Sequence, residues 1–324
     1  MRWADPGHPP RGPTMPFVTV ISAAGLTMQF GSQRALDSLD LQVPKGVTGL
    51  VGANGAGKTT LMSIALGLRA PTSGTITVLG LDPTKDAARL RSVVGYGPER
   101  NVLPEDMPAS DFVKHLAEVR GMPKSEARGR ASDALWLVGL GEERFRALGT
   151  MSTGQRQRVK LAQAIAADPS LVLLDEPTDG LDPVQRDEML ALIRQISAEY
   201  GIDVLLSSHL LEEVERICDN IVALDAGRLV AQGPLASLVG DTTTVTAELV
   251  ELVEHPGAVD GVEERLRAAG LDVRRDLNQL RVTAADQQTS LDAIRDAVAA
   301  EQARLRRVVV DRTTLEDLFT EAPA

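Results

Sequence analysis

The sequence predicts an α/β protein with a parallel β-sheet, a helical insertion and a small α+β module at its C-terminal end. Three observations support this fold class. Short, continuous apolar runs such as "GVTGLVGA", "SLVLLDEP" and "IDVLLSSH" are typical of parallel strands that are covered on both faces. The stretch from Leu103 to Ala147 has a helical pattern that Pro104, Pro108 and Pro123 interrupt. Beyond Asp241 the composition changes and the strand pattern starts again.

The first 16 residues are expected to be disordered. The opening "MRWADPGHPPRGPTMPF" is rich in proline and glycine and has no apolar core of the kind that a secretory signal needs. Apolar runs such as "LVLL" end within a few residues, far short of the roughly 20 that a membrane span requires. The single cysteine, Cys218, excludes an intrachain disulfide and is expected to be an inert core residue. A cytoplasmic location follows as an expectation.

Strand-like and helix-like patterns alternate from Val18 to about Gly240, so residues 17–240 are expected to form one domain. "GVTGLVGA" is a strand that leads into a glycine-rich loop, and "KTTLMSIALGLR" after it repeats apolar residues at helical spacing. "GTITVLG" alternates like a strand between turn residues. The helical insertion is expected over about 103–165.

Residues 241–324 are expected to form a separate accessory module. This part holds 17 Asp and Glu against 10 Arg and no Lys, so it carries −7 of the chain's net charge of −11. An acidic chain argues against a nucleic-acid partner. The patterns predict a strand, a helix, a hairpin, a helix and a strand at Thr243–Val250, Val259–Ala269, Val273–Thr283, Leu291–Ala300 and Leu305–Asp311. This order is ferredoxin-like. A last helix is expected after a capping box formed by Thr313 and Glu316.

A phosphate-binding loop is the first motif that carries chemistry. Gly52, Gly57, Lys58 and Thr59 in "GANGAGKTT" fit G-x-x-x-x-G-K-[ST] between a strand and a helix. The glycines let backbone N–H groups surround phosphates, and the helix start adds its positive end. The lysine reaches the β- and γ-phosphates, and the threonine hydroxyl can bind Mg²⁺. The predicted ATP-binding residues are Gly52, Ala53, Asn54, Gly55, Ala56, Gly57, Lys58, Thr59 and Thr60.

Two further strand ends supply candidate catalytic groups. In "LVLLDEP", Asp175 ends a buried strand where it can hold Mg²⁺, and Glu176 after it can act as the general base for an attacking water. His209 follows the strand "DVLLSSH", where a ring nitrogen can contact the γ-phosphate. The predicted catalytic residues are therefore Glu176, His209 and Lys58.

The combination of motifs resembles the ATP-binding cassette (ABC) transporter ATPases. "MSTGQRQRV", "LLDEPTDGLDP" and "SSH" follow the phosphate-binding loop in the order of that family, and the resemblance covers about Val18 to Gly240. It implies a RecA-like P-loop core with an antiparallel β region, and Mg²⁺-dependent ATP hydrolysis. The family signature, usually Leu-Ser-Gly-Gly-Gln, corresponds here to Met151, Ser152, Thr153, Gly154 and Gln155. Thr153 in place of glycine either narrows the approach of a phosphate or adds a hydroxyl donor.

The resemblance also implies a second copy of a cassette. In the family, two cassettes pair head to tail, and the signature helix of one meets the γ-phosphate held by the other. Each chain thus carries two anion sites, and each of these contributes to a different nucleotide site of the dimer. Asp182 in "TDGLDP" corresponds to the D-loop at the same interface.

Each of two further positions has two possible interpretations. Phe30 in "MQFGSQRAL" corresponds to the aromatic residue that stacks on adenine, or it is a core aromatic on a strand. Glu99 in "VVGYGPER" stands where the family usually has a glutamine that contacts Mg²⁺ and the membrane partner. It either acts at the metal or points to solvent.

The tail "TTLEDLF" is similar to the C-terminal extension of cassettes that serve bacterial drug, antibiotic, polysaccharide and lipid exporters. The resemblance implies an ATPase subunit, peripheral at the inner face of the cell membrane, that powers export of a small or lipid-like molecule through separate polytopic permease subunits. The alternatives are a soluble ABC ATPase that acts on a macromolecule, and a degenerate cassette that binds ATP without turnover.

Overall fold

The computed structural model describes residues 19–100, 103–250 and 257–316, and these form two compact units. The first unit ends at Leu235 and the second begins at Ala236, inside the short helix α8 (Leu235–Leu238). The predicted domain boundary at Gly240 is the first residue of the following strand, β10. No helix among the described residues is long and apolar enough to cross a membrane.

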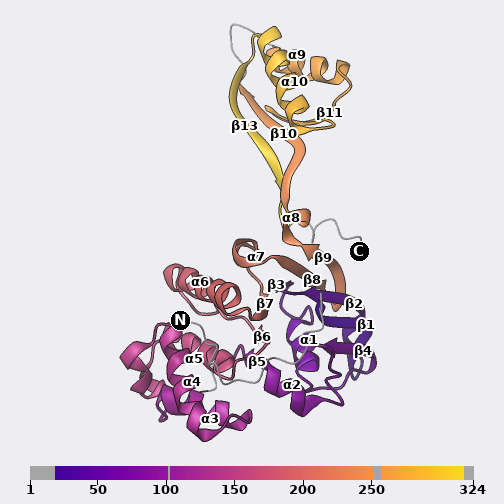
Figure 1. Ribbon diagram of the computed structural model, residues 1–324. Helices are drawn as coiled ribbons and strands as arrows, with labels where there is room; N and C mark the ends of the chain where they lie inside the picture. The colour runs from indigo at the N-terminus through magenta and orange to yellow at the C-terminus, as the bar shows by residue number, and fades with distance from the viewer. Residues whose placement is uncertain (1–18, 101–102, 251–256, 317–324) are drawn as a thin grey trace. The chain divides into compact units, whose positions relative to one another are not determined.

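A six-stranded sheet forms the centre of the first unit (Figure 1). Its strands in spatial order are β5 (Val94–Gly97), β6 (Leu171–Leu174), β7 (Asp203–Ser208), β3 (Val47–Val51), β8 (Asn220–Asp225) and β9 (Arg228–Pro234). The first five strands are parallel and β9 is antiparallel. Strands β3 and β6 are buried along their whole length, as the continuous apolar runs predict.

The N-terminal strands of the unit form a second, antiparallel sheet. It contains β2 (Gln33–Pro44), β1 (Thr19–Phe30) and β4 (Ser73–Val78) in that order. Its apolar side chains share one core with helix α1 (Lys58–Ala65) and with strand β3. This core fixes the position of the loop between β3 and α1, which carries the phosphate-binding motif.

Three helices lie within the expected insertion: α3 (Ala109–Val119), α4 (Lys124–Leu137) and α5 (Thr153–Ile165), with 3₁₀ turns at Gly141–Phe145 and Leu148–Thr150. The other helices beyond α1 in this unit are α2 (Ala87–Val93), α6 (Pro183–Tyr200) and α7 (Leu211–Ile217). Pro108 and Pro123 directly precede α3 and α4, where their fixed φ and missing N–H are tolerated. In Figure 1, α3, α4 and α5 form a group apart from the β1–β2–β4 sheet.

The second unit is a four-stranded antiparallel sheet with two helices. Its elements are β10 (Gly240–Val250), α9 (Ala258–Ala268), β11 (Asp272–Asp276), β12 (Gln279–Thr283), α10 (Gln287–Ala300) and β13 (Arg304–Thr313). The strand order β11-β12-β10-β13 is that of a split βαβ arrangement. Alternate residues of β10 (Val245, Ala247 and Leu249) are buried in a core with both helices. The fold class, including the small α+β module, is thereby confirmed.

The predicted last helix lies mostly outside the described residues. Its proposed cap residue, Thr313, is the last residue of strand β13, where it pairs with Gly240. The strand therefore extends two residues beyond the predicted end at Asp311, because the long partner strand β10 continues the ladder. Extended backbone is also what an N-cap residue adopts, so the helix after Thr313 stays a prediction.

Candidate functional site

A cavity of about 440 Å³ opens at the carboxyl ends of the parallel strands. It brings together most of the residues predicted to bind ATP, but Gly52, Ala56, Asp175 and His209 are not in its wall. Its wall contains Phe30, Gln33, Ala35, Ala53, Asn54, Gly55, Gly57, Lys58, Thr59, Thr60, Glu99 and Glu176. Phe30 is the last residue of β1 and is 40% exposed with Arg69 over its ring, so the core-aromatic interpretation does not hold. An exposed aromatic ring at the mouth of a phosphate site is suited to stacking on a base.

Two glycines of the phosphate-binding loop are required by geometry. Gly52 has φ +152°, and a Cβ there would lie 2.3 Å from the backbone oxygen of Leu224. Gly57 has φ +105°, and its Cβ would lie 2.6 Å from Leu36 Cδ2. A side chain at either position would be strained and would collide with the neighbouring segment. Glycine at these two positions therefore lets the loop pass close to Leu224 and Leu36 on its way to the start of α1.

Lys58 is the first residue of α1 and is buried, with 6% of its surface exposed. Its ammonium group donates to the backbone oxygen of Gly52 at 2.6 Å and lies 3.5 Å from Glu176 Oε1. The Lys58 ammonium group is thus held inside the loop by the Gly52 oxygen and the Glu176 carboxylate, and a phosphate could replace these partners. This is the position that the motif requires for contact with the β- and γ-phosphates.

Asp175 has a donor set that fits a divalent cation. Its side chain is 1% exposed, and Oδ1 accepts from Ser207 Oγ at 2.7 Å and from Thr59 Oγ1 at 3.5 Å. Its other oxygen, Oδ2, is buried without a hydrogen-bond partner among the described residues. A buried carboxylate oxygen without a donor is costly. A hard cation held by this oxygen and the threonine hydroxyl would satisfy it.

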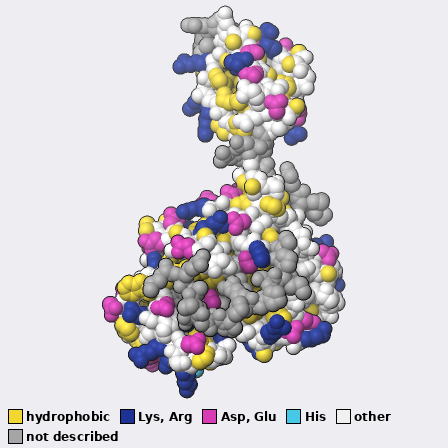
Figure 2. All heavy atoms as spheres, in the orientation of Figure 1, with side chains coloured by type: hydrophobic (Ala, Val, Ile, Leu, Met, Phe, Trp, Pro, Cys, Tyr) yellow, Lys and Arg dark blue, Asp and Glu magenta, His cyan; other side chains and the backbone are white. Residues whose placement is uncertain are grey.

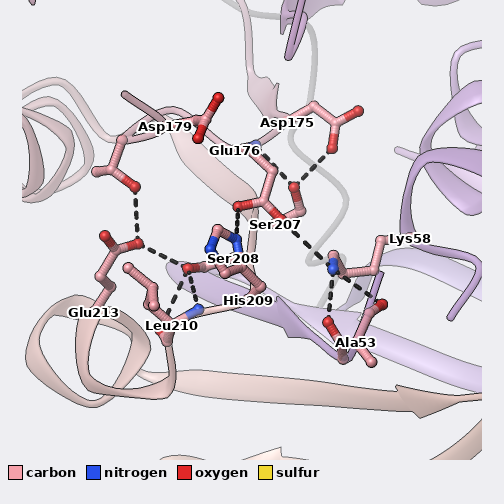
Figure 3. A network of polar contacts seen from close by, with 12 residues as sticks. Ala53, Lys58, Asp175, Glu176, Asp179, Ser207, Ser208, His209, Leu210 and Glu213 are labelled. Carbon is pink, nitrogen blue, oxygen red and sulfur yellow. Dashed lines mark hydrogen bonds and ion pairs between the residues drawn. The ribbon is translucent and has the colours of Figure 1, made fainter. Parts of the chain in front are cut away.

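Glu176 occupies a backbone conformation that is unusual for a residue with a side chain. Its φ is +47°, and its N–H donates to Ser207 Oγ at 2.9 Å. Its carboxylate lies 2.9 Å from His209 Nδ1 and reaches the cavity wall (Figure 3). Strained backbone of this kind occurs mainly at functional sites, where the surrounding structure must hold it. Here a single buried serine supports both Asp175 and Glu176.

Ser207 and a second supporting residue, Glu213, were not among the residues predicted from the sequence. Glu213 lies in α7 with 3% of its surface exposed. Its Oε2 accepts from Thr178 Oγ1 at 2.8 Å and from Ser208 Oγ at 2.7 Å, while Oε1 lies 3.2 Å from Arg186 Nε. This network ties the segment after β6 to the end of β7 (Figure 3). The two serines of "SSH" were the available signal, because continuous apolar strands rarely end in consecutive hydroxyl residues.

The signature residues start helix α5. Ser152 is the N-cap, and its side chain accepts from Gln155 N while Gln155 Oε1 accepts from Ser152 N, which is a capping box. Thr153 is exposed. Its methyl group packs on the loop before Asp182, because Thr153 Cγ2 would lie only 3.3 Å from a Cβ atom added to Gly180. Met151 is buried, as a substitute for leucine should be.

The signature residues Met151–Gln155 and Asp182, all of them described, do not line the cavity. Asp182 caps helix α6, where its Oδ1 accepts from Gln185 N at 2.8 Å. The two anion sites predicted from the sequence are therefore separate within one chain. Glu99 does line the cavity and is also exposed, so both interpretations of this residue remain open.

A buried lysine connects the signature helix to the Glu99 loop. Lys160 lies in α5 with 3% of its surface exposed, and its ammonium group donates to the backbone oxygen of Glu99 at 2.8 Å. Burial lowers the pKa of Lys160 to about 8, although Asp179, Asp175 and Glu99 oppose this shift.

The cysteine expected to be inert is buried too, and burial raises the pKa of the Cys218 thiol well above its usual range.

Comparisons with known proteins agree with this geometry. Residues 36–179 match the family model for "ABC transporter". The methionine import ATP-binding protein MetN of Mesorhizobium japonicum is 34% identical over 83% of this chain and 74% of its own length. The daunorubicin resistance ATP-binding protein DrrA3 of Streptomyces coeruleorubidus is 30% identical over 93% of this chain and 95% of its own. The solved structure of cbiO1 from Clostridium perfringens, part of the ABC transporter complex cbiONQ, superposes with a TM-score of 0.60, at 28% identity over 67% of this chain and 88% of that chain.

The first prediction concerns Glu176. Glu176→Gln keeps the size and shape of the side chain but removes the base, so nucleotide should still bind while turnover falls by about 10²–10⁴-fold. Steady-state ATPase assays and nucleotide titrations measure both quantities. The matched control is Glu212→Gln on the exposed side of α7, which should change neither. Turnover at the parental rate would show that another group activates the water.

The second prediction concerns the pH dependence of stability at Lys160. Because its folded pKa of about 8 lies below the ordinary 10.5, the unfolded chain binds more protons between these values. The wild-type protein should therefore gain stability relative to Lys160→Met as pH rises from 8 to 10, by about 1–3 kcal/mol. Denaturant unfolding at several pH values tests this expectation. Parallel curves for the two proteins would mean that the folded-state pKa is not lowered.

Proposed function

We propose that this chain, which belongs to the ABC transporter family and is an ATPase of that family, uses ATP hydrolysis to power export of a small or lipid-like molecule through separate membrane subunits. The observation that carries the proposal is that the catalytic residues meet at one edge of the cassette's sheet and that a C-terminal module follows the cassette in the same chain. A relative named for daunorubicin resistance matches over 95% of its own length, whereas the importer matches over 74%. Both matches reach into the accessory module, and the one to the resistance protein covers 93% of this chain against 83% for the importer, which favours an export partner.

The catalytic roles follow from positions in the cavity. Lys58 holds the phosphates at the start of α1, and Glu176 removes a proton from the attacking water. His209, whose Nδ1 is hydrogen-bonded to Glu176, orients that carboxylate and contacts the γ-phosphate. Mg²⁺, when bound by Thr59 and Asp175, would neutralise charge on the phosphates. Glu99 on the same wall is the further candidate ligand.

A second copy of the cassette completes the site. Ser152 and Gly154 start an α-helix whose positive N-terminal end suits a phosphate, yet this helix start does not line the chain's own cavity. In a head-to-tail dimer, each cavity receives the signature helix of the other copy. ATP binding then closes the interface and hydrolysis reopens it.

A groove of about 490 Å³ on the cassette is the proposed contact for the membrane subunits. It is lined mainly by apolar side chains: Leu66, Leu68, Ala88, Val94, Tyr96, Pro98, Leu116 and Val119, with Arg91, Ser92, Arg120 and Gln163. Val119 and Leu68 are 69% and 61% exposed. The groove includes Pro98, next to Glu99, so a segment seated there could transmit its movement to the cavity. This contact would hold the chain peripherally at the inner face of the membrane.

Composite sites are tested by complementation between inactive copies. A Lys58→Ala chain loses its own cradle, and a Ser152→Ala chain loses its own signature cap. When the two are mixed, each heterodimer contains one intact composite site, so some activity should return, with roughly a quarter of the wild-type rate as the ceiling under random pairing and independent sites. Activity per chain should also rise with protein concentration. A proven monomer with a concentration-independent rate would contradict the head-to-tail arrangement.

The groove is tested by charge insertion. Val119→Lys places a charge on the exposed apolar wall and should weaken coupling to the membrane subunits, because a buried unpaired charge opposes docking. Basal ATPase activity should stay within about twofold, while stimulation by membrane subunits should fall by about tenfold or more. Leu277→Lys, at an 84% exposed position in the second unit, is the control. Unchanged stimulation in Val119→Lys would exclude this groove as the docking site.

A further inference from the structure

A cation lies over one face of the aromatic ring at the mouth of the cavity. The guanidinium carbon of Arg69 is 5.2 Å from the centroid of the Phe30 ring. This distance is within the roughly 6 Å that a cation–π contact allows. Phe30 belongs to the cavity wall, whereas Arg69 does not. The cation therefore approaches the ring from outside the cavity, and the other face of the ring is the one that a ligand in the cavity can reach.

The end of helix α1 fixes where the segment with Arg69 begins. Gly67 follows the helix with φ +67°, and its N–H donates to Ile64 O at 2.9 Å. The N–H of Leu68 donates to Ser63 O at 2.9 Å. These two bonds form a Schellman motif, which requires the left-handed conformation that glycine adopts most easily. The chain thus leaves α1 in a defined direction immediately before Arg69.

A second anchor lies on the other side of Arg69. Thr72 N donates to Thr27 O at 2.9 Å, and Thr72 Oγ1 accepts from Gln29 N at 3.0 Å. Both partners are residues of strand β1, which ends at Phe30. The segment is therefore attached to the strand that carries the aromatic ring, and the contact between Arg69 and Phe30 follows from the backbone as well as from the side chains.

An ion pair does not explain the position of Arg69. Basic and acidic side chains are interspersed over the face of the first unit that Figure 2 shows. Arg34, in strand β2 next to Phe30, lies 2.7 Å from Asp37. Arg69, by contrast, forms no ion pair with a carboxylate of the described residues. Its contact is with the aromatic ring.

This contact lowers the cost of binding a flat base. Phe30 is 40% exposed, and a side chain that becomes ordered only on binding reduces the affinity for the ligand. A guanidinium group against one face keeps the ring in one orientation before the ligand arrives. A heteroaromatic base can then stack on the opposite face without that loss.

We propose that Arg69 is a positioning residue for the base of the nucleotide. It holds the Phe30 ring from outside the cavity, so that the adenine of ATP stacks on the face directed into the cavity. The inference rests on the proposed function of the cavity as the ATP site. It adds a residue outside the cavity wall, and it predicts that Arg69 affects the binding of the base and not the binding of the phosphates.

The base and the phosphates can be separated by two probes. Equilibrium titrations of the full chain with Mg²⁺ use ADP and inorganic tripolyphosphate, which has no base. Arg69→Met keeps the aliphatic stem and removes the charge, so the dissociation constant for ADP should rise by about threefold to tenfold. The constant for tripolyphosphate should stay within about twofold, because phosphates bind at the loop before α1.

Three further variants define how the residue acts. Arg69→Lys keeps a cation and should restore part of the ADP affinity that Arg69→Met loses. Arg89→Met, at an exposed position of α2 outside the cavity wall, is the matched control and should change neither constant. Phe30→Leu should weaken ADP binding by itself, and adding Arg69→Met to it should have no further effect, because the ring that the cation holds is gone. Melting temperatures check that each variant is folded.

Four results would overturn the proposal: unchanged or tighter ADP binding in Arg69→Met, an equal loss for tripolyphosphate, an undiminished effect of Arg69→Met in the Phe30→Leu background, or full ADP affinity in Phe30→Leu alone. Tighter binding would mean that the guanidinium occupies the place of the base. An equal loss would mean that it attracts the phosphates by its charge. The titrations involve no hydrolysis, no dimer and no membrane subunit, so the ATPase and the composite sites are judged separately, by Glu176→Gln and by complementation.

Discussion

The site depends on the register of three parallel strands. β3 and β7 pair so that Val51 lies beside Ser208, and β7 and β6 pair so that Leu206 lies beside Leu174. Since parallel strands end at one edge, the phosphate-binding loop, the Asp175-Glu176 pair and His209 leave the sheet at the same place. These segments are far apart in the chain, and the backbone ladder is what brings their side chains within hydrogen-bonding distance. Slippage by one residue would turn each of them to the opposite face.

Holding acidic groups at this edge is costly, and the neighbouring hydroxyl groups reduce that cost. Asp175 and Glu213 are almost fully buried, and each accepts from a serine of β7. Ser207 also binds the N–H of Glu176, so the strained turn after β6 cannot relax without breaking a buried bond. The two hydrogen bonds from serine hydroxyls to carboxylates are charge-assisted, which makes them stronger than bonds between neutral groups. Strand β7 therefore supports the turn at Asp175-Glu176 and also leads directly into His209.

Sequence patterns predicted the fold class and the residues of the cavity because both follow from local rules. Glycines, lysine and threonine at fixed spacing define the loop, and the strand, helix and hairpin patterns of the C-terminal module correspond to β10–β13 within a few residues. Lys160, Ser207 and Glu213 could not be found in this way. Their importance depends on which strand or helix lies next to them, and this is a property of the tertiary structure.

The start of helix α5 has no place in the cavity of its own chain. Ser152 and Gln155 close a capping box there, and neither residue lines the cavity. Under the proposed head-to-tail arrangement, this helix start would instead contribute to the cavity of a second copy. That arrangement would explain why a single gene product carries both a phosphate-binding loop and a signature helix, because each of them would complete a site with the other copy.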